Sequence, residues 1–81
     1  MWYVYILECK NGKLYTGITK DPDRRFKEHE EKSARYTSYN PPARFVHTET
    51  YLTRSEAQKR ECRIKRLRRD EKLALIDGKN H

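Results

Sequence analysis

The sequence predicts a small α/β fold, in which a three-stranded, antiparallel-type sheet is flanked by helices in the order ββαβαα. Two runs rich in aromatic and β-branched residues flank Asn11-Gly12, a dipeptide typical of β-hairpin turns. Two helix-start signals follow, Asp21-Pro22 and a capping box that begins at Thr53. With 81 residues, of which 35 % are hydrophobic and 38 % charged, we expect one domain over residues 1–81 with one small core.

The first two strands are expected at residues 2–9 and 13–19, and the loop between them decides their register. A two-residue loop would pair Tyr5 with Ile18 and place Tyr5 and Tyr15 on opposite faces. A three-residue loop, with Gly12 left-handed in a bulge, would pair Tyr5 with Gly17 and bring both tyrosines to one face. We prefer the three-residue loop because it collects the apolar side chains on the other face. That expected core face consists of Val4, Ile6, Leu14 and Ile18.

A first helix is expected to begin at Asp21-Pro22, with Asp21 as the N-cap, and to end near Glu31. Phe26 is the only large apolar residue of this segment, so the helix should be anchored at one point.

Residues 33–42 are predicted to form a loop, because they contain the breaker Asn40-Pro41-Pro42. A third strand is expected over residues 44–51, with Phe45 and His47 on one face.

The capping box from Thr53 to Glu56 should start a second helix that ends near Arg68. Glu61 lies on or beside its apolar stripe, because it is four residues after Ala57 and three before Ile64.

A last short helix is expected over residues 70–76 and should end at Gly78. Its inward side chains would be Leu73, Leu75 and Ile76.

The chain carries 19 Lys and Arg against 12 Asp and Glu, a net charge of +7. Such a balance indicates a polyanionic partner, and nucleic acid is favoured over an anionic membrane. The cations are densest on the second helix, where they could follow a phosphate backbone. Tyr36 and Tyr39 in the loop could stack on unpaired bases. The expected nucleic-acid-binding residues are Arg35, Lys59, Arg63, Arg66 and Arg69.

Cys9 and Cys62 are the only cysteines, and they form no metal-binding spacing with the histidines. Two separate cysteines fit a reduced cytosol. No apolar run approaches the roughly 18 residues that span a membrane, and no secretory signal precedes Trp2. We therefore expect a cytoplasmic protein without a membrane partner.

The side chains suited to phosphodiester cleavage are phenols, a guanidinium, an imidazole and a carboxylate. Arg25 and His29 lie one helical turn apart on one face. Glu61 is costly near a buried face unless it is paired or coordinated, so it is either an ion-pair partner of Arg63 or Lys65 or a metal ligand. A single carboxylate suits Mg²⁺ or Mn²⁺ better than Zn²⁺.

These motifs, taken in order, resemble the GIY-YIG nuclease domain over nearly the whole chain. Tyr3-Val4-Tyr5 stands where that family has Gly-Ile-Tyr, and Tyr15-Thr16-Gly17 stands where it has Tyr-Ile-Gly. The segment 24–29 is similar to the Arg/His helix of the family, and Glu61 is similar to its metal-binding glutamate. The size and the opening of the chain most resemble the stand-alone bacterial members.

The resemblance implies a divalent-metal-dependent endonuclease that cuts nucleic acid, with DNA as the expected substrate and low sequence specificity. Tyr5 or Tyr15 would position or deprotonate the attacking water. Arg25 would bind the scissile phosphate, and His29 would assist by hydrogen bonding. Glu61 would hold one Mg²⁺ or Mn²⁺ ion. The structural residue of the motif would be Gly17.

Two other functions fit the same composition. One is a nucleic-acid-binding module with weak or silent catalysis, and the other is a small interaction protein whose basic face meets an acidic partner. Glu61, Arg25 and Tyr15 favour catalysis, because a carboxylate within a basic surface weakens phosphate binding. We expect no attached DNA-binding domain, so specificity would come from the basic surface or from a protein partner.

Overall fold

The computed structural model describes residues 1–35 and 42–78, with backbone only for residues 32–35. The predicted order ββαβαα is confirmed. The bounds of the elements are β1 Trp2–Cys9, β2 Leu14–Thr19, α1 Pro22–Arg35, β3 Pro42–Tyr51, α2 Arg54–Arg66 and α3 Arg69–Ile76.

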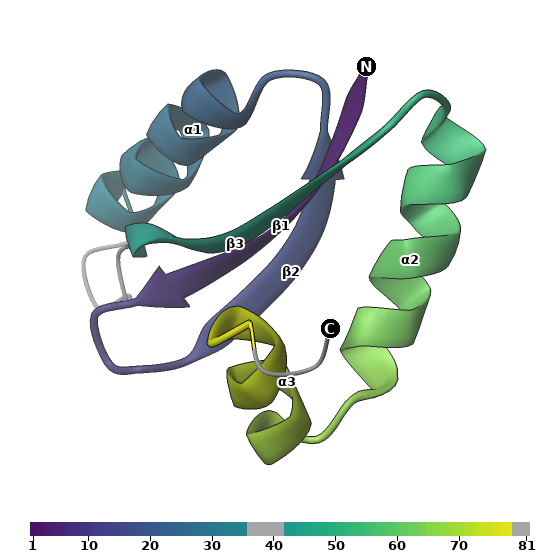
Figure 1. The fold of residues 1–81 in the computed structure, drawn as a ribbon. Coiled ribbons are helices and arrows are strands. Elements are labelled where there is room, and N and C mark those ends of the chain that lie inside the picture. Colours follow the sequence, from purple (N-terminus) through teal and green to yellow (C-terminus); the bar gives the residue numbers. More distant parts are fainter. Residues whose placement is uncertain (36–41, 79–81) are drawn as a thin grey trace.

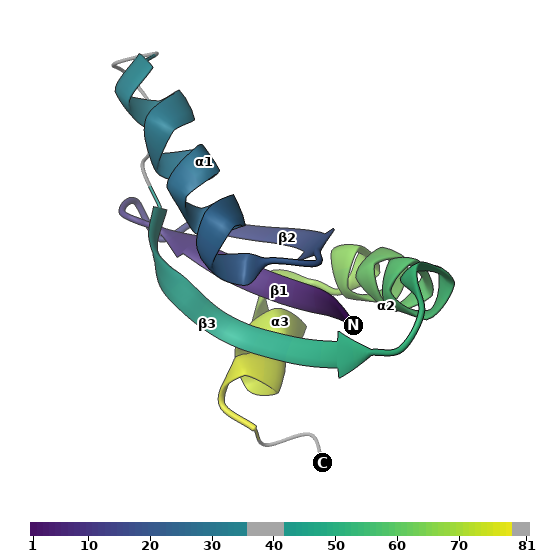
Figure 2. The same ribbon diagram turned by 90° about the horizontal axis from the view of Figure 1, so that it is seen from above.

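The three strands form one antiparallel sheet in the order β2-β1-β3, so β1 is central and the other two strands are its edges. Figure 1 shows α1 on one side of this sheet and α2 and α3 on the other. Figure 2, seen from above, separates α1 from α3 across the strands in the same way. The sheet is therefore covered on both faces, and each face has its own set of side chains.

The hairpin has the predicted three-residue loop. Tyr5 pairs with Gly17 and Leu7 with Tyr15, as expected for that register. Gly12 has a φ of 88°, in the left-handed region that favours glycine. The prediction that both tyrosines share one face is therefore confirmed.

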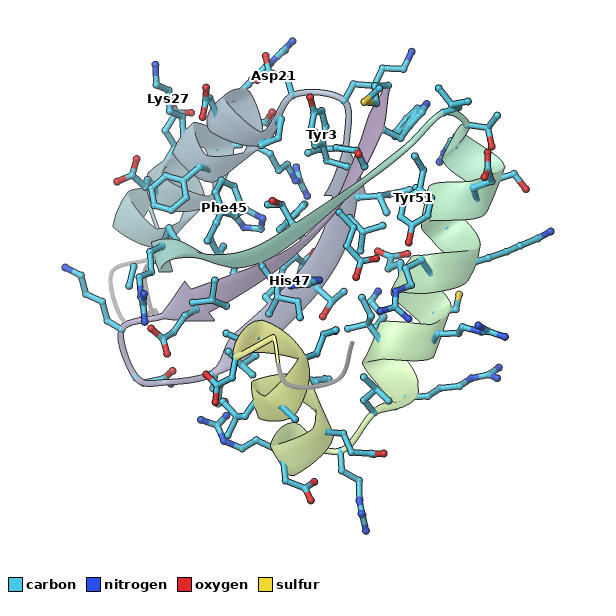
Figure 3. All side chains as sticks on the ribbon, in the orientation of Figure 1. Tyr3, Asp21, Lys27, Phe45, His47 and Tyr51 are labelled. Carbon is cyan, nitrogen blue, oxygen red and sulfur yellow. The ribbon has the colours of Figure 1, made fainter. Side chains whose placement is uncertain are left out.

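Strand β3 contains a bulge that the sequence pattern did not reveal. Ile6 pairs with His47 while its neighbour Leu7 pairs with Phe45, so two steps along β3 match one step along β1. The prediction that Phe45 and His47 share a face is wrong for this reason. Phe45 packs towards α1, and His47 lies on the side of α2 and α3 (Figure 3).

Helix α1 begins as predicted, because Asp21 accepts a hydrogen bond from the backbone N–H of Arg24 at 3.2 Å. It ends at Arg35 rather than near Glu31. No glycine or proline interrupts residues 32–35, and alanine and arginine favour the helix there. Residues 33–35 thus belong to α1 and Pro42 belongs to β3, so the loop predicted over 33–42 is wrong at these positions. Tyr36 and Tyr39 lie outside the described residues.

The second helix has the predicted N-cap, since Thr53 accepts a hydrogen bond from the backbone N–H of Glu56. It ends at Arg66, two residues before the expected Arg68. The backbone N–H of Arg68 instead donates to Glu71 at 2.9 Å, which caps the start of α3. The chain therefore leaves α2 early because Arg68 begins the next helix.

The final helix ends as predicted before Gly78, which has a φ of 71°. Leu75 and Ile76 pack against the core. Leu73 is 41 % exposed, so its predicted inward position is wrong. At about 100° per residue it projects to one side of the face that Leu75 and Ile76 form.

The core lies between the sheet and the two helices α2 and α3. Its fully buried members come from the predicted face of β1 and the predicted stripe of α2. Leu14 and Ile18 of β2 pack against them, as expected. These fully buried residues are Val4, Ile6, Ala57 and Ile64.

A charged network joins β3 to α2 at the border of this core. Arg60 donates to both carboxylate oxygens of Glu49, at 2.8 and 3.0 Å. Tyr51 also donates to Glu49, and His47 lies 2.7 Å from it. Burial alone would raise the pKa of Glu49, but these hydrogen bonds outweigh it and hold the pKa at about 2.

Glu49→Gln is expected to destabilise the protein by about 2–3 kcal/mol at neutral pH, because the amide cannot replace the charged, bidentate partner of Arg60. Because the pKa of Glu49 is lowered in the folded protein, the ionised carboxylate stabilises the fold fully at pH values above its unfolded pKa of about 4.3. This stabilisation is lost as pH falls through the folded pKa. Urea unfolding at several pH values should thus show that the difference in unfolding free energy between the wild-type protein and Glu49→Gln shrinks as pH falls from about 4.5 towards about 2. A free-energy difference that stays constant over that range would contradict the stabilising role of the ionised Glu49.

Candidate active site

Tyr5 is the centre of the face that α1 covers. It is 1 % exposed and packs edge-on against Phe45, with ring centroids 5.4 Å apart. Across the hairpin, a Cβ on Gly17 would lie 2.5 Å from the Tyr5 hydroxyl oxygen and 2.7 Å from Cζ. The tyrosine ring therefore occupies the space that any side chain at position 17 would need.

The Tyr5 hydroxyl meets two side chains of α1. His29 Nε2 lies 3.3 Å from it, and Arg25 Nε donates to it at 3.4 Å. Burial raises the pKa of Tyr5, and the Arg25 hydrogen bond acts in the opposite direction. Because burial dominates, Tyr5 is poorly suited to lose its proton at neutral pH.

Arg25 joins the two tyrosines. Its hydrogen bond to Tyr5 raises the pKa of Arg25, and a hydrogen bond to Tyr15 acts in the same direction. A terminal nitrogen of its guanidinium also donates to Glu28 at 3.1 Å. The predicted face of Arg25 and His29 is thus turned to the tyrosines and is not merely a solvated helix face.

Tyr15 is the accessible phenol of the site. It is 43 % exposed, its ring lies 6.3 Å from that of Tyr5, and it packs edge-on against His29 at 5.0 Å. A hydroxyl on an exposed ring can reach a water or a phosphate that the buried Tyr5 cannot. Of the two phenols between which the sequence left the choice open, Tyr15 is the one exposed to solvent.

Glu61 reaches this group from α2. Its side chain is 17 % exposed, and Lys65 Nζ lies 3.5 Å from one carboxylate oxygen. The carboxylate is close enough to Tyr5 to raise its pKa, as the weakest of five causes. Glu61 therefore has the ion-pair partner Lys65 that the sequence suggested, and its charge acts weakly on Tyr5.

The donor set around Glu61 limits which metal could be held there. Within residues 1–35 and 42–78, no group of three or more His, Cys, Asp and Glu could hold a metal ion. A hard divalent cation that keeps several waters and takes one protein carboxylate fits this arrangement, whereas a Zn²⁺ site with four protein ligands does not.

Lys20 is not part of this face. Its Nζ lies 5.2 Å from the centroid of the Trp2 ring, and Trp2 packs against the core. Ile18, on the same side of β2, also packs against the core.

The predicted nucleic-acid-binding residues do not gather at the tyrosines. Lys59, Arg63 and Arg66 line one groove on α2. Arg69 instead donates to the backbone carbonyl of Gly12 at 3.0 Å and so ties α3 to the hairpin. The side chain of Arg35 lies outside the described residues.

Two neighbours of the site were missed from the sequence. Glu28 pairs with Arg25 at a spacing of three residues, which is a recognisable helical signal. Phe45 packs against Tyr5 and Phe26. Its contact with Tyr5 depends on the bulge in β3, for which the residue pattern gave no signal.

Comparison with known proteins agrees with this geometry. A family model described as the GIY-YIG catalytic domain matches residues 1–74. A UPF0213 protein of Xanthomonas axonopodis pv. citri is 44 % identical over 78 residues, which cover 95 % of this chain and 76 % of that protein. A UPF0213 protein of Staphylococcus epidermidis is 47 % identical over 75 residues, which cover 91 % and 92 % of the two chains.

A solved structure also resembles the chain. The solution NMR structure of a UPF0213 protein from Bacillus halodurans is 46 % identical, with a TM-score of 0.61. The match covers 95 % of this chain and 84 % of that one. The likeness extends across the elements that carry the candidate site.

Proposed function

The chain belongs to the GIY-YIG family, which supports a nuclease-type function, and from this premise we propose a divalent-metal-dependent endonuclease that acts on DNA with low sequence specificity. One observation carries the proposal. The hydroxyl of Tyr5 on β1 meets Arg25 and His29 of α1, beside the exposed Tyr15 of β2. Phenols, a guanidinium and an imidazole from three elements thus converge on one face.

In the proposed reaction a water oxygen attacks the phosphorus and releases its proton to solvent, while the bond to the leaving oxygen breaks and that oxygen takes a proton from solvent. Arg25 is charged and partly exposed, so it binds the scissile phosphate and offsets its developing charge. Tyr15 accepts a hydrogen bond from the attacking water and orients it. His29, held between the two phenols, positions Tyr15 and assists by hydrogen bonding. Tyr5 acts as the buried support for Arg25 and His29.

Glu61 is the proposed ligand of a single Mg²⁺ or Mn²⁺ ion, with water and substrate oxygens as its other ligands. When bound, such an ion offsets negative charge on the phosphate and the leaving oxygen. The chain's own contribution is a mostly buried carboxylate whose charge acts weakly on Tyr5. The ion pair with the exposed Lys65 is weak enough to be exchanged.

The proposed partner is DNA, recognised through its phosphates because the chain carries a net charge of +7. Specificity then comes from this surface or from a protein partner. No helix within residues 1–35 and 42–78 is long and apolar enough to cross a membrane. We propose that the protein acts in the cytoplasm, in keeping with its two free cysteines.

The test is incubation of the purified protein with labelled single-stranded and duplex DNA in Mg²⁺, in Mn²⁺ and in chelator. Cleavage that requires the metal supports the proposal and gives the strand preference. Binding without cleavage in either metal would replace it with a catalytically silent nucleic-acid-binding module. The pairing of Arg25 with Glu28, which competes with a phosphate, is the observation that favours this second function.

Tyr15→Phe is expected to lower the single-turnover cleavage rate by about 10²-fold, because it removes the hydroxyl that orients the water. Stability should change by less than about 0.5 kcal/mol, since the ring is retained and the group is partly exposed. Rates and thermal unfolding of the same preparations test both statements. An unchanged rate would remove Tyr15 from the reaction. Tyr3→Phe, which removes a phenol from β1 on the same face of the sheet, is the matched control.

A further inference from the structure

A basic groove lies on the side of α2 that faces β3. It has a volume of about 530 Å³ and is open to solvent. Tyr51 of β3 forms one wall, and Figure 3 shows this side chain directed at α2. The α2 side chains that matter here are Glu56, Lys59, Arg60, Arg63 and Arg66.

Three of these cations lack an ionic partner. Lys59, Arg63 and Arg66 are exposed and form no ion pair within residues 1–35 and 42–78. Among the described residues, Glu56 is the one acid that lines the groove, and one of its oxygens accepts a hydrogen bond from Thr53. The groove therefore presents positive charge that the fold itself does not neutralise.

The spacing of these cations suits an extended polyanion. Residues 59, 63 and 66 follow one another at intervals of four and three, so they form one stripe along the helix. At a rise of about 1.5 Å per residue the stripe is about 10 Å long, which equals roughly three nucleotide steps of about 3.4 Å. Favourable interaction with the helix dipole explains cations in the last turn, but Lys59 lies well before it.

The groove is separate from the candidate active site. Arg60 forms an ion pair with Glu49 of β3. The side of α2 that carries Arg60 therefore faces the edge of the sheet formed by β3. Glu61 is two residues from both Lys59 and Arg63, about 200° round the helix, so its side chain leaves α2 on the opposite side from the groove. Tyr15 and Gly17 belong to β2, the opposite edge. The central strand separates the two edges by about 10 Å, so one phosphate cannot contact both places.

We infer that this groove is a second, non-catalytic site for a nucleic-acid strand, which binds the phosphate backbone through Lys59, Arg63 and Arg66. Tyr51 provides an aromatic wall beside the bound strand, and Arg60 remains engaged with Glu49. The site increases affinity and residence on DNA without touching the scissile phosphate. This inference concerns binding and does not require that the chain cleave DNA.

The test compares a groove variant with a control of equal charge. The groove variant is Lys59→Ala/Arg63→Ala/Arg66→Ala, and the control, Lys10→Ala/Lys13→Ala/Lys72→Ala, removes three charges from the hairpin and α3. Fluorescence anisotropy with labelled single-stranded and duplex oligonucleotides is measured in chelator, between about 50 and 200 mM salt. Thermal unfolding checks that each variant folds.

The groove variant should bind about ten times more weakly or worse, and its salt slope should fall by about 0.7–0.9 for each lost phosphate contact. The control should keep most of the slope. Equal losses in both variants would overturn the inference, because the cations would then act only as general surface charge. The separate variant Arg63→Lys/Arg66→Lys preserves the charge of the groove and should keep most of the wild-type affinity.

If the wild-type protein cleaves DNA, the groove variant should need a higher protein concentration to reach its maximal single-turnover rate, because its binding is weaker, and this shift should exceed any fall in the maximal rate. A maximal rate that falls as much as the affinity would show that the groove belongs to the active site. It would contradict the inference that the groove is a second, non-catalytic site. If the wild-type protein does not cleave DNA, the proposed function fails, and the binding comparison still decides the inference.

Discussion

Replacing Glu61 by glutamine is expected to lower the metal-dependent cleavage rate by about 10³-fold, the equivalent of about 4 kcal/mol of transition-state stabilisation. The amide has nearly the same shape as the carboxylate but carries no charge, so it cannot hold a divalent ion. Affinity for DNA should stay equal or rise, because the variant has one negative charge fewer. Cleavage is measured in Mg²⁺ under single-turnover conditions, and binding is measured in chelator.

Stability separates this role from a structural one. The ion pair of Glu61 with the exposed Lys65 is a helical i,i+4 pair, worth about 0.3–0.5 kcal/mol. Glu61→Gln should therefore unfold at nearly the wild-type temperature. Glu31→Gln removes the same charge from an exposed position of α1 and should leave the rate unchanged. Loss of stability and of affinity together in Glu61→Gln would identify the residue as a structural ion-pair partner.

The hairpin could be predicted in detail because two independent constraints agreed. Turn chemistry at Asn11-Gly12 allowed two loop lengths, and only one of them sorted the apolar residues onto a single face. The observed pairing of Tyr5 with Gly17 follows from that choice. Local and long-range preferences point to the same register here, which is why residue pattern alone was sufficient.

The positions of Phe45 and of the α2 cations could not be predicted in the same way. At the bulge in β3, Val46 packs against the core, and such a tertiary contact has no local signal in the sequence. On α2, the density of basic residues indicated binding, but only the bond from Arg60 to Glu49 fixes which flank faces β3. The sequence therefore predicted the chemistry of these side chains better than their grouping.

Replacing Gly17 by alanine is the second substitution for which we expect a large effect. Alanine in a strand normally stabilises a protein slightly relative to glycine, because the unfolded chain has less freedom. Here the new Cβ would lie 2.5 Å from the hydroxyl oxygen of Tyr5, a buried side chain that cannot move aside freely. We expect a loss of about 1–3 kcal/mol from overpacking. Cleavage should fall as well, because Tyr5 supports Arg25 and His29.

A double-mutant cycle with Tyr5 tests the cause, because residues in contact give non-additive effects. In the Tyr5→Phe background the closest contact is gone but the one to Cζ, at 2.7 Å, persists, so the cost of Gly17→Ala should fall only in part. In the Tyr5→Leu background all three close contacts disappear, and the alanine should become neutral or stabilising. Urea unfolding of the single and double variants gives these differences. An equal cost in every background would mean that Gly17 is required for its own strand rather than for Tyr5.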